Sequence, residues 1–69
     1  MAETDYSIPL AQRFTEGISI IYAAQPGADF AAEHDIFYFG SPDGLSEEAR
    51  ARLDVLGWFV SDDSMAFFT

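Results

Sequence analysis

His34 is the only histidine in this chain, and it lies between two carboxylates, Glu33 and Asp35. Imidazole and carboxylate groups are common zinc ligands and common partners in proton transfer, so the trio invites interpretation as a metal site or an acid–base centre. In an extended segment, however, successive side chains point to opposite faces, which separates His34 from both neighbours. The further ligands would have to come from distant positions that the sequence does not identify. We therefore expect His34 to be a polar residue at a strand entry or turn, and we expect no metal site.

Nucleophilic catalysis has no recognisable centre in the sequence. The chain contains neither cysteine nor lysine, and its serines fall in expected caps, turns or one ambiguous helix, outside any nucleophile motif. The adjacent Asp62 and Asp63 would serve as a catalytic carboxylate pair only inside a cleft, for which a 69-residue domain has little room. The glycines follow no phosphate-binding spacing. The sequence therefore predicts a protein that is not an enzyme, with no catalytic residue and no cofactor.

A helix over residues 46–56 is the clearest secondary-structure element in the sequence. Ser46 is a suitable N-cap, acidic residues in the following turn complement the helix dipole, and Gly57 suits the position after the last turn. The stripe that this helix would bury consists of Ala49, Leu53 and Leu56. Its outer face offers two i,i+4 ion pairs, Glu48 with Arg52 and Arg50 with Asp54. We expect an amphipathic surface helix.

Aromatic and β-branched residues predict strands elsewhere in the second half of the chain. The segments are 35–40, expected to be a central strand, then 58–60 and 65–68, with a weaker candidate at 28–33. Ser61 to Ser64 would join the last two strands into a hairpin. Because this turn contains no glycine, we expect a four-residue type I loop rather than a two-residue primed turn. Helices should cover one face of the sheet and leave Phe59, Phe68 or both partly open.

The first third of the chain is compatible with two structures. Leu10, Phe14, Ile18 and Ile21 form a helical stripe behind a Ser7 cap, whereas residues 18–22 also resemble a strand. We predict a helix over residues 8–24, in which Gly17 would cost roughly 1 kcal/mol relative to alanine.

These elements combine into one predicted fold. Residues 1–69 should form a single acidic α+β domain, with an antiparallel sheet of three or four strands and two helices packed on one side. Its core should be centred on Leu53, Leu56, Trp58 and one face of the strand at residues 36–39.

Charge restricts the partners of this domain. Twelve acidic residues and three arginines give a formal net charge of −9, while 49% of the residues are hydrophobic and 16% aromatic, which separates the chain from disordered acidic tails. Phosphate backbones and anionic membrane surfaces are bound by lysine and arginine, so we expect no direct binding of nucleic acid and no membrane association. The N-terminus lacks the basic start and apolar run of a secretion signal. We expect a monomer in the cytoplasm.

The candidate partner-binding residues are the carboxylates expected outside the core. They are Asp29, Glu33, Asp35, Asp43, Glu47, Glu48, Asp54, Asp62 and Asp63.

Three features follow one another in the chain. They are the pattern from Gly27 to Tyr38, which includes Ala32-Glu33-His34-Asp35, then a capped helix, and then Leu56-Gly57-Trp58-Phe59. In these features the chain resembles a known class of proteins. These are small acidic proteins of bacterial phages and mobile elements, and within them the chain is most similar to anti-CRISPR inhibitors of type I-C systems. The resemblance covers about the C-terminal two-thirds. Similar chains often carry a tryptophan in the final strand, where this one has Met65-Ala66-Phe67-Phe68.

The resemblance implies a mechanism that the charge also permits. Clustered carboxylates would compete with DNA phosphates for the basic channel of a type I surveillance complex (Cascade), and so block target DNA in the cytoplasm of the infected host bacterium. The alternative is a phage or mobile-element accessory protein that binds a partner through exposed aromatic residues, centred on Phe59, Phe68 or Tyr38. Ionic strength should weaken the first kind of binding steeply and the second hardly at all.

Overall fold

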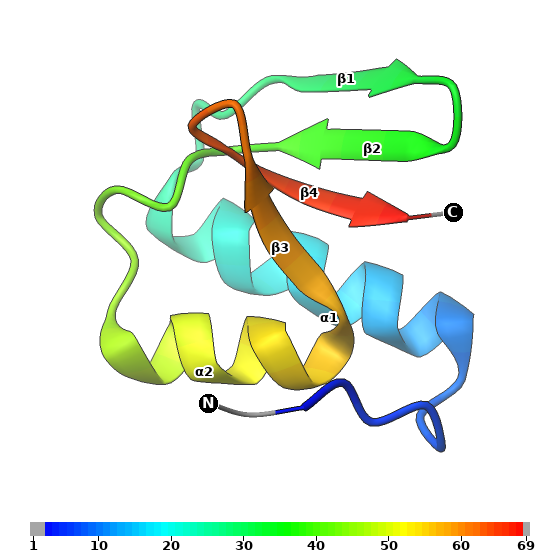
Figure 1. The fold of residues 1–69 in the computed structure, drawn as a ribbon. Coiled ribbons are helices and arrows are strands. Elements are labelled where there is room, and N and C mark those ends of the chain that lie inside the picture. The colour runs from blue at the N-terminus through cyan, green and yellow to red at the C-terminus, as the bar shows by residue number, and fades with distance from the viewer. Residues whose placement is uncertain (1–2, 69) are drawn as a thin grey trace.

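The computed structural model describes residues 3–68 as two helices and a four-stranded antiparallel sheet. In chain order the elements are α1 (Leu10–Ala24), β1 (Phe30–Glu33), β2 (Ile36–Phe39), α2 (Glu47–Leu56), β3 (Trp58–Ser61) and β4 (Ser64–Phe68). The strands lie in the order β1-β2-β4-β3, and both helices lie on the same side of the sheet (Figure 1). The predicted α+β fold is confirmed, with the strand at residues 36–39 inside the sheet. No helix in the described part of the chain is long and apolar enough to cross a membrane.

Helix α1 includes residues 18–22, so the helical interpretation of this segment is correct. The predicted Ser7 cap is wrong, because Pro9 occupies the N-cap position and no side chain caps the helix. Ser7 instead belongs to a local turn, in which its backbone N–H donates to Asp5 Oδ1 over 3.0 Å and its hydroxyl donates to the same oxygen. The nearby carboxylate provides Ser7 with an acceptor before the helix begins.

Helix α2 has the predicted start and stop. Ser46 Oγ accepts a hydrogen bond from the backbone N–H of Ala49 at 3.1 Å. Gly57 closes the helix in the left-handed region with φ 96°, a conformation that glycine adopts without steric cost. The last turn of α2 contains no basic residue, but Arg13 of α1 provides one, with its Nη1 3.5 Å from the carbonyl oxygen of Leu56. A cation is favourable at this end of a helix dipole.

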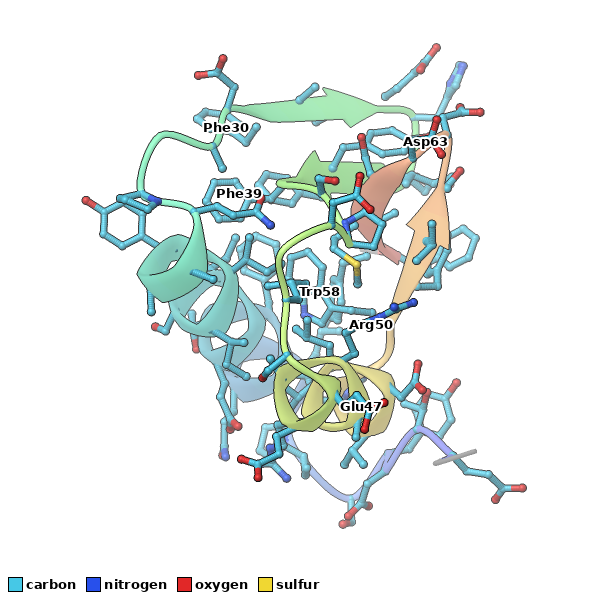
Figure 2. The ribbon with its side chains drawn as sticks, turned by 90° about the vertical axis from the view of Figure 1, so that its left-hand side faces the viewer. Phe30, Phe39, Glu47, Arg50, Trp58 and Asp63 are labelled. Atoms are coloured by element: carbon cyan, nitrogen blue, oxygen red, sulfur yellow. The ribbon has the colours of Figure 1, made fainter. Side chains whose placement is uncertain are left out.

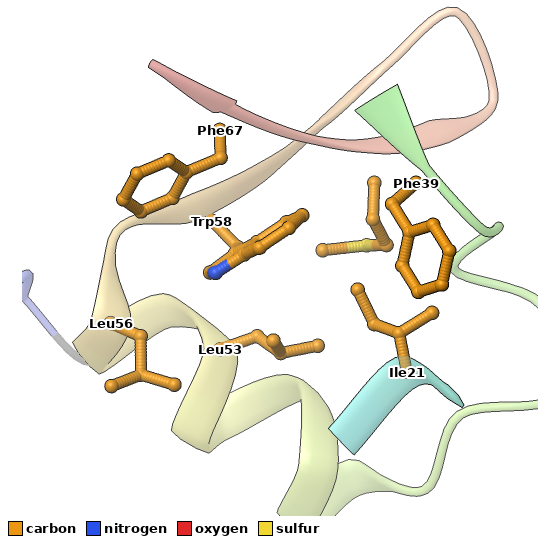
Figure 3. Packing of buried hydrophobic residues seen from close by; sticks show 7 residues of the cluster. Ile21, Phe39, Leu53, Leu56, Trp58 and Phe67 are labelled. Carbon is orange, nitrogen blue, oxygen red and sulfur yellow. The ribbon is translucent and has the colours of Figure 1, made fainter. Parts of the chain in front are cut away.

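The core lies between the helices and the sheet (Figure 3). The predicted centre is confirmed, since Leu53, Leu56 and Trp58 are buried, as is Phe39 on the helix-facing side of β2. Ile21 of α1 and Met65 and Phe67 of β4 complete the cluster. Among residues 3–68 no polar or charged residue is buried.

Trp58 is fixed against the backbone of α1. Its indole N–H donates to the carbonyl oxygen of Arg13 over 3.1 Å, and its ring lies directly over Gly17. A Cβ atom built on Gly17 would lie 1.9 Å from Trp58 Nε1, closer than any real contact. The glycine that lowers the helix propensity of this segment therefore makes room for the largest side chain of the core.

We predict that Gly17→Ala destabilises the protein by about 1–3 kcal/mol, because the added methyl group must displace the Trp58 ring. In an unconstrained helix the same substitution would stabilise by roughly 0.5–1 kcal/mol. Gly27→Ala is the matched control, since a Cβ there meets nothing within 4 Å and the backbone is not left-handed. Urea unfolding of both variants would test this, and a Gly17→Ala protein as stable as its parent would contradict the described packing.

We also predict that Leu53→Ala costs about 2–5 kcal/mol, since Leu53 is fully buried in the centre of the core. A chain of this size has a total stability of only about 3–10 kcal/mol, so the variant should be largely unfolded or melt far below its parent. Ala51, an exposed residue of the same helix, provides the control as Ala51→Ser. Thermal melts of the two variants within a few degrees of each other would refute the assignment of Leu53 to the core.

Candidate functional site

All nine candidate carboxylates lie on the surface. This exposure follows from the core, which is apolar throughout the described residues and leaves every acidic side chain in contact with solvent. The structure also divides the nine residues into groups that belong to different parts of the fold.

The first group gathers at one end of the sheet. Asp62 and Asp63 form the turn between β3 and β4, and Asp29 immediately precedes β1. The backbone N–H of Met65 donates to the carbonyl oxygen of Gly40 over 3.1 Å, which places the start of β4 beside the end of β2. Asp43, in the loop that leaves β2, lies at this same end. Asp29, Asp43 and the Asp62–Asp63 turn are distant in sequence, and the strand pairing places the segments that carry them at the same end of the sheet.

The turn that carries Asp62 and Asp63 differs from the predicted type I loop. Ser61 pairs directly with Ser64, so the turn contains only two residues. Both have positive φ, 50° for Asp62 and 61° for Asp63, which is the pattern of a type I′ turn. The prediction failed because aspartate tolerates the left-handed region better than most residues, so glycine is not required here.

Gln25 holds the loop that contains Asp43. Its side-chain N–H groups donate to the carbonyl oxygens of Ser41 at 2.7 Å and Asp43 at 2.9 Å, while its Oε1 accepts from the Ser41 backbone N–H at 2.9 Å. The side-chain amide of Gln25, at the end of α1, thus takes part in three hydrogen bonds that hold a polar loop 16 to 18 residues away in the sequence. No local pattern predicts this contact, because a single glutamine before a proline is compatible with many environments.

The other two groups lie elsewhere. Glu33 and Asp35 flank the turn between β1 and β2, at the opposite end of the sheet from Asp62 and Asp63. Glu47, Glu48 and Asp54 belong to α2, beneath the sheet. Figure 2 shows Glu47 and Asp63 at opposite ends of the molecule. The acidic residues therefore surround the fold and do not form one continuous patch.

Two of the three arginines have structural partners. Arg13 donates from Nε to the carbonyl oxygen of Ile8 at 3.1 Å, and its guanidinium lies 5.2 Å from the centre of the Tyr6 ring. Arg52 forms a two-point ion pair with Glu16 of α1, including an Nη2 to Oε1 distance of 3.0 Å. The predicted Glu48–Arg52 pair is thus wrong, because the two helices pack side by side and offer Arg52 a carboxylate across the interface.

Arg50 is exposed, and within residues 3–68 it forms no ion pair with Asp54 or any other carboxylate. The second predicted pair on α2 is therefore also wrong. The positive charge of Arg50 therefore stays available to interact with the negative charge of the surface carboxylates.

His34 occupies the turn between β1 and β2, as expected, with φ 55°. It is exposed, and no group of three or more histidine, aspartate or glutamate side chains in the described chain is arranged to hold a metal ion.

An apolar hollow of about 230 Å³ opens between the start of α1 and the end of β4. Its lining residues are Leu10, Ala11, Phe14 and Phe67. The volume is below the roughly 300–1,000 Å³ of typical ligand pockets. Because none of the four side chains is titratable, the hollow can receive an apolar group but offers no acid, base or nucleophile.

The face of the sheet opposite the helices also carries large side chains. Tyr38 and Phe59 lie on either side of Ala66 in one cross-strand row, and Phe68 stacks on Phe59 with ring centres 5.1 Å apart. Phe68 is 61% exposed, which confirms the expectation that this face stays partly open. The strand pairing adds Ile36 beside Phe68, a neighbour that the sequence analysis did not identify.

Neither a protein-family model, nor a curated protein, nor a solved structure matches this chain. The chemistry of the surface and the residues that carry the resemblance described above are therefore the features that bear on function.

Two acidic residues outside the candidate set have partners that lower their pKa. Hydrogen bonds from the hydroxyl and backbone N–H of Ser7 lower the pKa of Asp5. The hydrogen bond from Arg52 lowers the pKa of Glu16 from its ordinary value of 4.5. A lowered pKa means that the folded state favours the ionised carboxylate, so this contribution to stability is present above the ordinary pKa and is lost as pH falls through the lowered one.

We therefore predict that Glu16→Gln lowers the thermal midpoint at pH 7 by a few degrees, and that the difference from the parent disappears as the pH falls below the ordinary pKa of the carboxyl group and through the lowered one. The exposed Glu3 serves as the control in Glu3→Gln, because no ion pair of Glu3 occurs within residues 3–68. Thermal melts between pH 7 and pH 2.5 provide the measurement. An equal difference at both ends of that range would show that Glu16 acts through packing and not through its charge.

Proposed function

We propose that this protein is an inhibitor of a bacterial type I CRISPR–Cas surveillance complex, most similar in mode to inhibitors of type I-C systems, and that it blocks target DNA by occupying a basic DNA-recognition surface. The observation that carries the proposal is the exposure of all nine candidate carboxylates around a core that, within residues 3–68, buries no charge. Two of the three arginines are engaged in structural contacts, so little positive charge on the surface opposes them.

The physical basis of inhibition is competition for the same cations. A channel that receives DNA is lined by lysine and arginine, and its field attracts a compact body of charge −9 as it attracts phosphates. Carboxylates that pair with these cations exclude the DNA backbone. Binding alone suffices, so the proposal requires no turnover, metal or cofactor, and it places the protein in the cytoplasm of the infected host.

The arrangement of the carboxylates sharpens this proposal. Since the three groups belong to the two ends of the sheet and to α2, a basic channel that encloses the protein can contact more of them than a flat basic surface can. Two paired strands hold the backbone of the Asp62–Asp63 turn, and Gln25 holds the backbone of the loop that contains Asp43, so little backbone entropy is lost when a partner binds there.

A second candidate function is supported by the open face of the sheet. Tyr38, Phe59 and Phe68 offer an aromatic surface of the kind that forms the centre of protein interfaces. On this alternative the protein is an accessory interaction module of a phage or mobile element, and its binding should respond weakly to ionic strength.

We predict that neutralising the turn in Asp62→Asn/Asp63→Asn, or reversing α2 in Glu47→Lys/Glu48→Lys/Asp54→Lys, restores DNA binding by the surveillance complex. Asparagine suits the turn because it tolerates positive φ as aspartate does. Each charge pair lost from a desolvated interface can cost about 2–5 kcal/mol in affinity. A gel-shift competition with purified type I-C complex and target DNA, at low and physiological salt, measures the effect.

The control variant is Ser19→Lys/Ala23→Lys, which adds two positive charges on exposed positions of α1 without removing a candidate carboxylate. If inhibition depends on particular carboxylates, this variant should still block DNA almost as well as the parent. If both carboxylate variants block DNA like the parent and salt has no effect, the charge-based proposal is wrong and the aromatic interface is the better account.

A further inference from the structure

We propose that the helix-free face of the sheet is a docking surface for arginine side chains of the partner protein, and that it selects arginine over lysine. This inference rests on the proposed function in one respect, namely that the partner is basic. It goes further by assigning the contact surface and the residue type that this surface recognises.

The first observation is an aromatic row on the open face. The strand register places Tyr38, Ala66 and Phe59 side by side on β2, β4 and β3. Ala66 is fully buried although no helix covers this side of the sheet (Figure 1). Its larger cross-strand neighbours, Tyr38 and Phe59, therefore cover it and form an aromatic centre on this face.

Phe68 extends this centre toward the end of β4. Its ring stacks on Phe59 at 5.1 Å with an interplanar angle of 29°, and 61% of the residue remains exposed. A monomer gains little from such an arrangement, because the ring leaves most of its apolar surface in water. A planar guanidinium can stack on a ring presented in this way, at a distance within about 6 Å of its centre.

Carboxylates border the aromatic residues on the same face. Glu33 pairs with Ile36 across β1 and β2, and Ile36 pairs with Phe68, so Glu33, Ile36 and Phe68 form a second row parallel to the first. Glu33 is exposed to solvent on the edge strand β1. The turn residues Asp62 and Asp63 border the opposite end of the face. A ring and a carboxylate on one surface match the two binding modes of arginine, which stacks through its plane and pairs through its edge.

Other occupants fit this surface less well. A second copy of the chain would bring another −9 of charge against the first, which opposes association. A purely apolar partner would remove Glu33 from water without a compensating cation. Lysine would satisfy the charge, but its compact and strongly hydrated ammonium group makes poorer use of the rings.

The test uses ¹⁵N-labelled protein and two ten-residue peptides, one alternating arginine with glycine and the other alternating lysine with glycine. At physiological ionic strength the arginine peptide should bind about fivefold more tightly. Amide shifts should concentrate at Glu33, Tyr38, Phe59 and Phe68. The indole N–H resonance of Trp58, which reports its bond to Arg13, verifies the fold of each variant.

Two variants separate the roles of rings and charge. Phe68→Ser should remove most of the preference for arginine, while Glu33→Gln should weaken both peptides and leave the preference in place. Tyr22→Ser is the matched control, because Tyr22 is a similarly exposed aromatic residue, at 58%, but belongs to α1. It should change neither affinity nor preference.

Equal affinity for the two peptides, or shifts concentrated in α2 or the Asp62–Asp63 turn, would overturn the inference. These outcomes are distinguishable from a failure of the proposed function. If the arginine preference appears on this face but the surveillance complex still binds DNA freely, docking to arginine stands and the proposed inhibition fails. If DNA is displaced while the two peptides bind alike, inhibition stands and the docking face is wrong.

Discussion

The contact between the Trp58 ring and the backbone of Gly17 is the interaction on which the rest of this small structure depends. The indole ring lies close enough to α1 for its N–H to donate a hydrogen bond to the carbonyl oxygen of Arg13, over 3.1 Å. Trp58 also begins β3 directly after Gly57 ends α2, so one side chain fixes α1, the end of α2 and the start of the last hairpin relative to one another. In a chain without disulfides, such packing contacts join elements that are distant in sequence. The glycine in the middle of α1 is thus required by the packing, despite its unfavourable helix propensity.

This apolar core determines the character of the surface. Because the described core contains no charged or polar residue, every candidate carboxylate remains in solvent, and the net charge of −9 is carried by the exterior. The three arginines are already counted in that net charge, and two of them lie at structural contacts. Arg13 lies against the end of α2, and Arg52 joins the two helices through Glu16. Both arginines therefore stabilise the fold. Dense negative charge opposes compaction and favours binding to cations, and the two effects have the same physical origin.

The two surfaces that the structure offers are complementary in chemistry. The carboxylates provide long-range attraction that is screened by salt, whereas the stacked rings of Phe59 and Phe68 provide short-range contact that is not. In sequence these features suggested competing functions. In the fold, Glu33 and Phe68 belong to one cross-strand row through Ile36, so a single partner can engage both. An arginine-bearing surface is the partner chemistry that uses the two together.

Local signals in the sequence determined most of the elements. The cap at Ser46, the glycine after Leu56 and the apolar spacing of α2 each depend on residues within one or two turns, where propensity and periodicity act directly. The composition likewise determined that the surface is acidic, since a small apolar core cannot contain charge.

Only the tertiary structure decided how those elements and charges are arranged. It replaced the expected Glu48–Arg52 pair by a pair with Glu16, because helix packing supplied a partner 36 residues away. It placed Asp62 and Asp63 in a two-residue turn, because the register of β3 and β4 left no room for a longer loop. It also brought Glu33 into line with Phe68, since neighbours across a sheet are set by strand order and register, which no local pattern encodes.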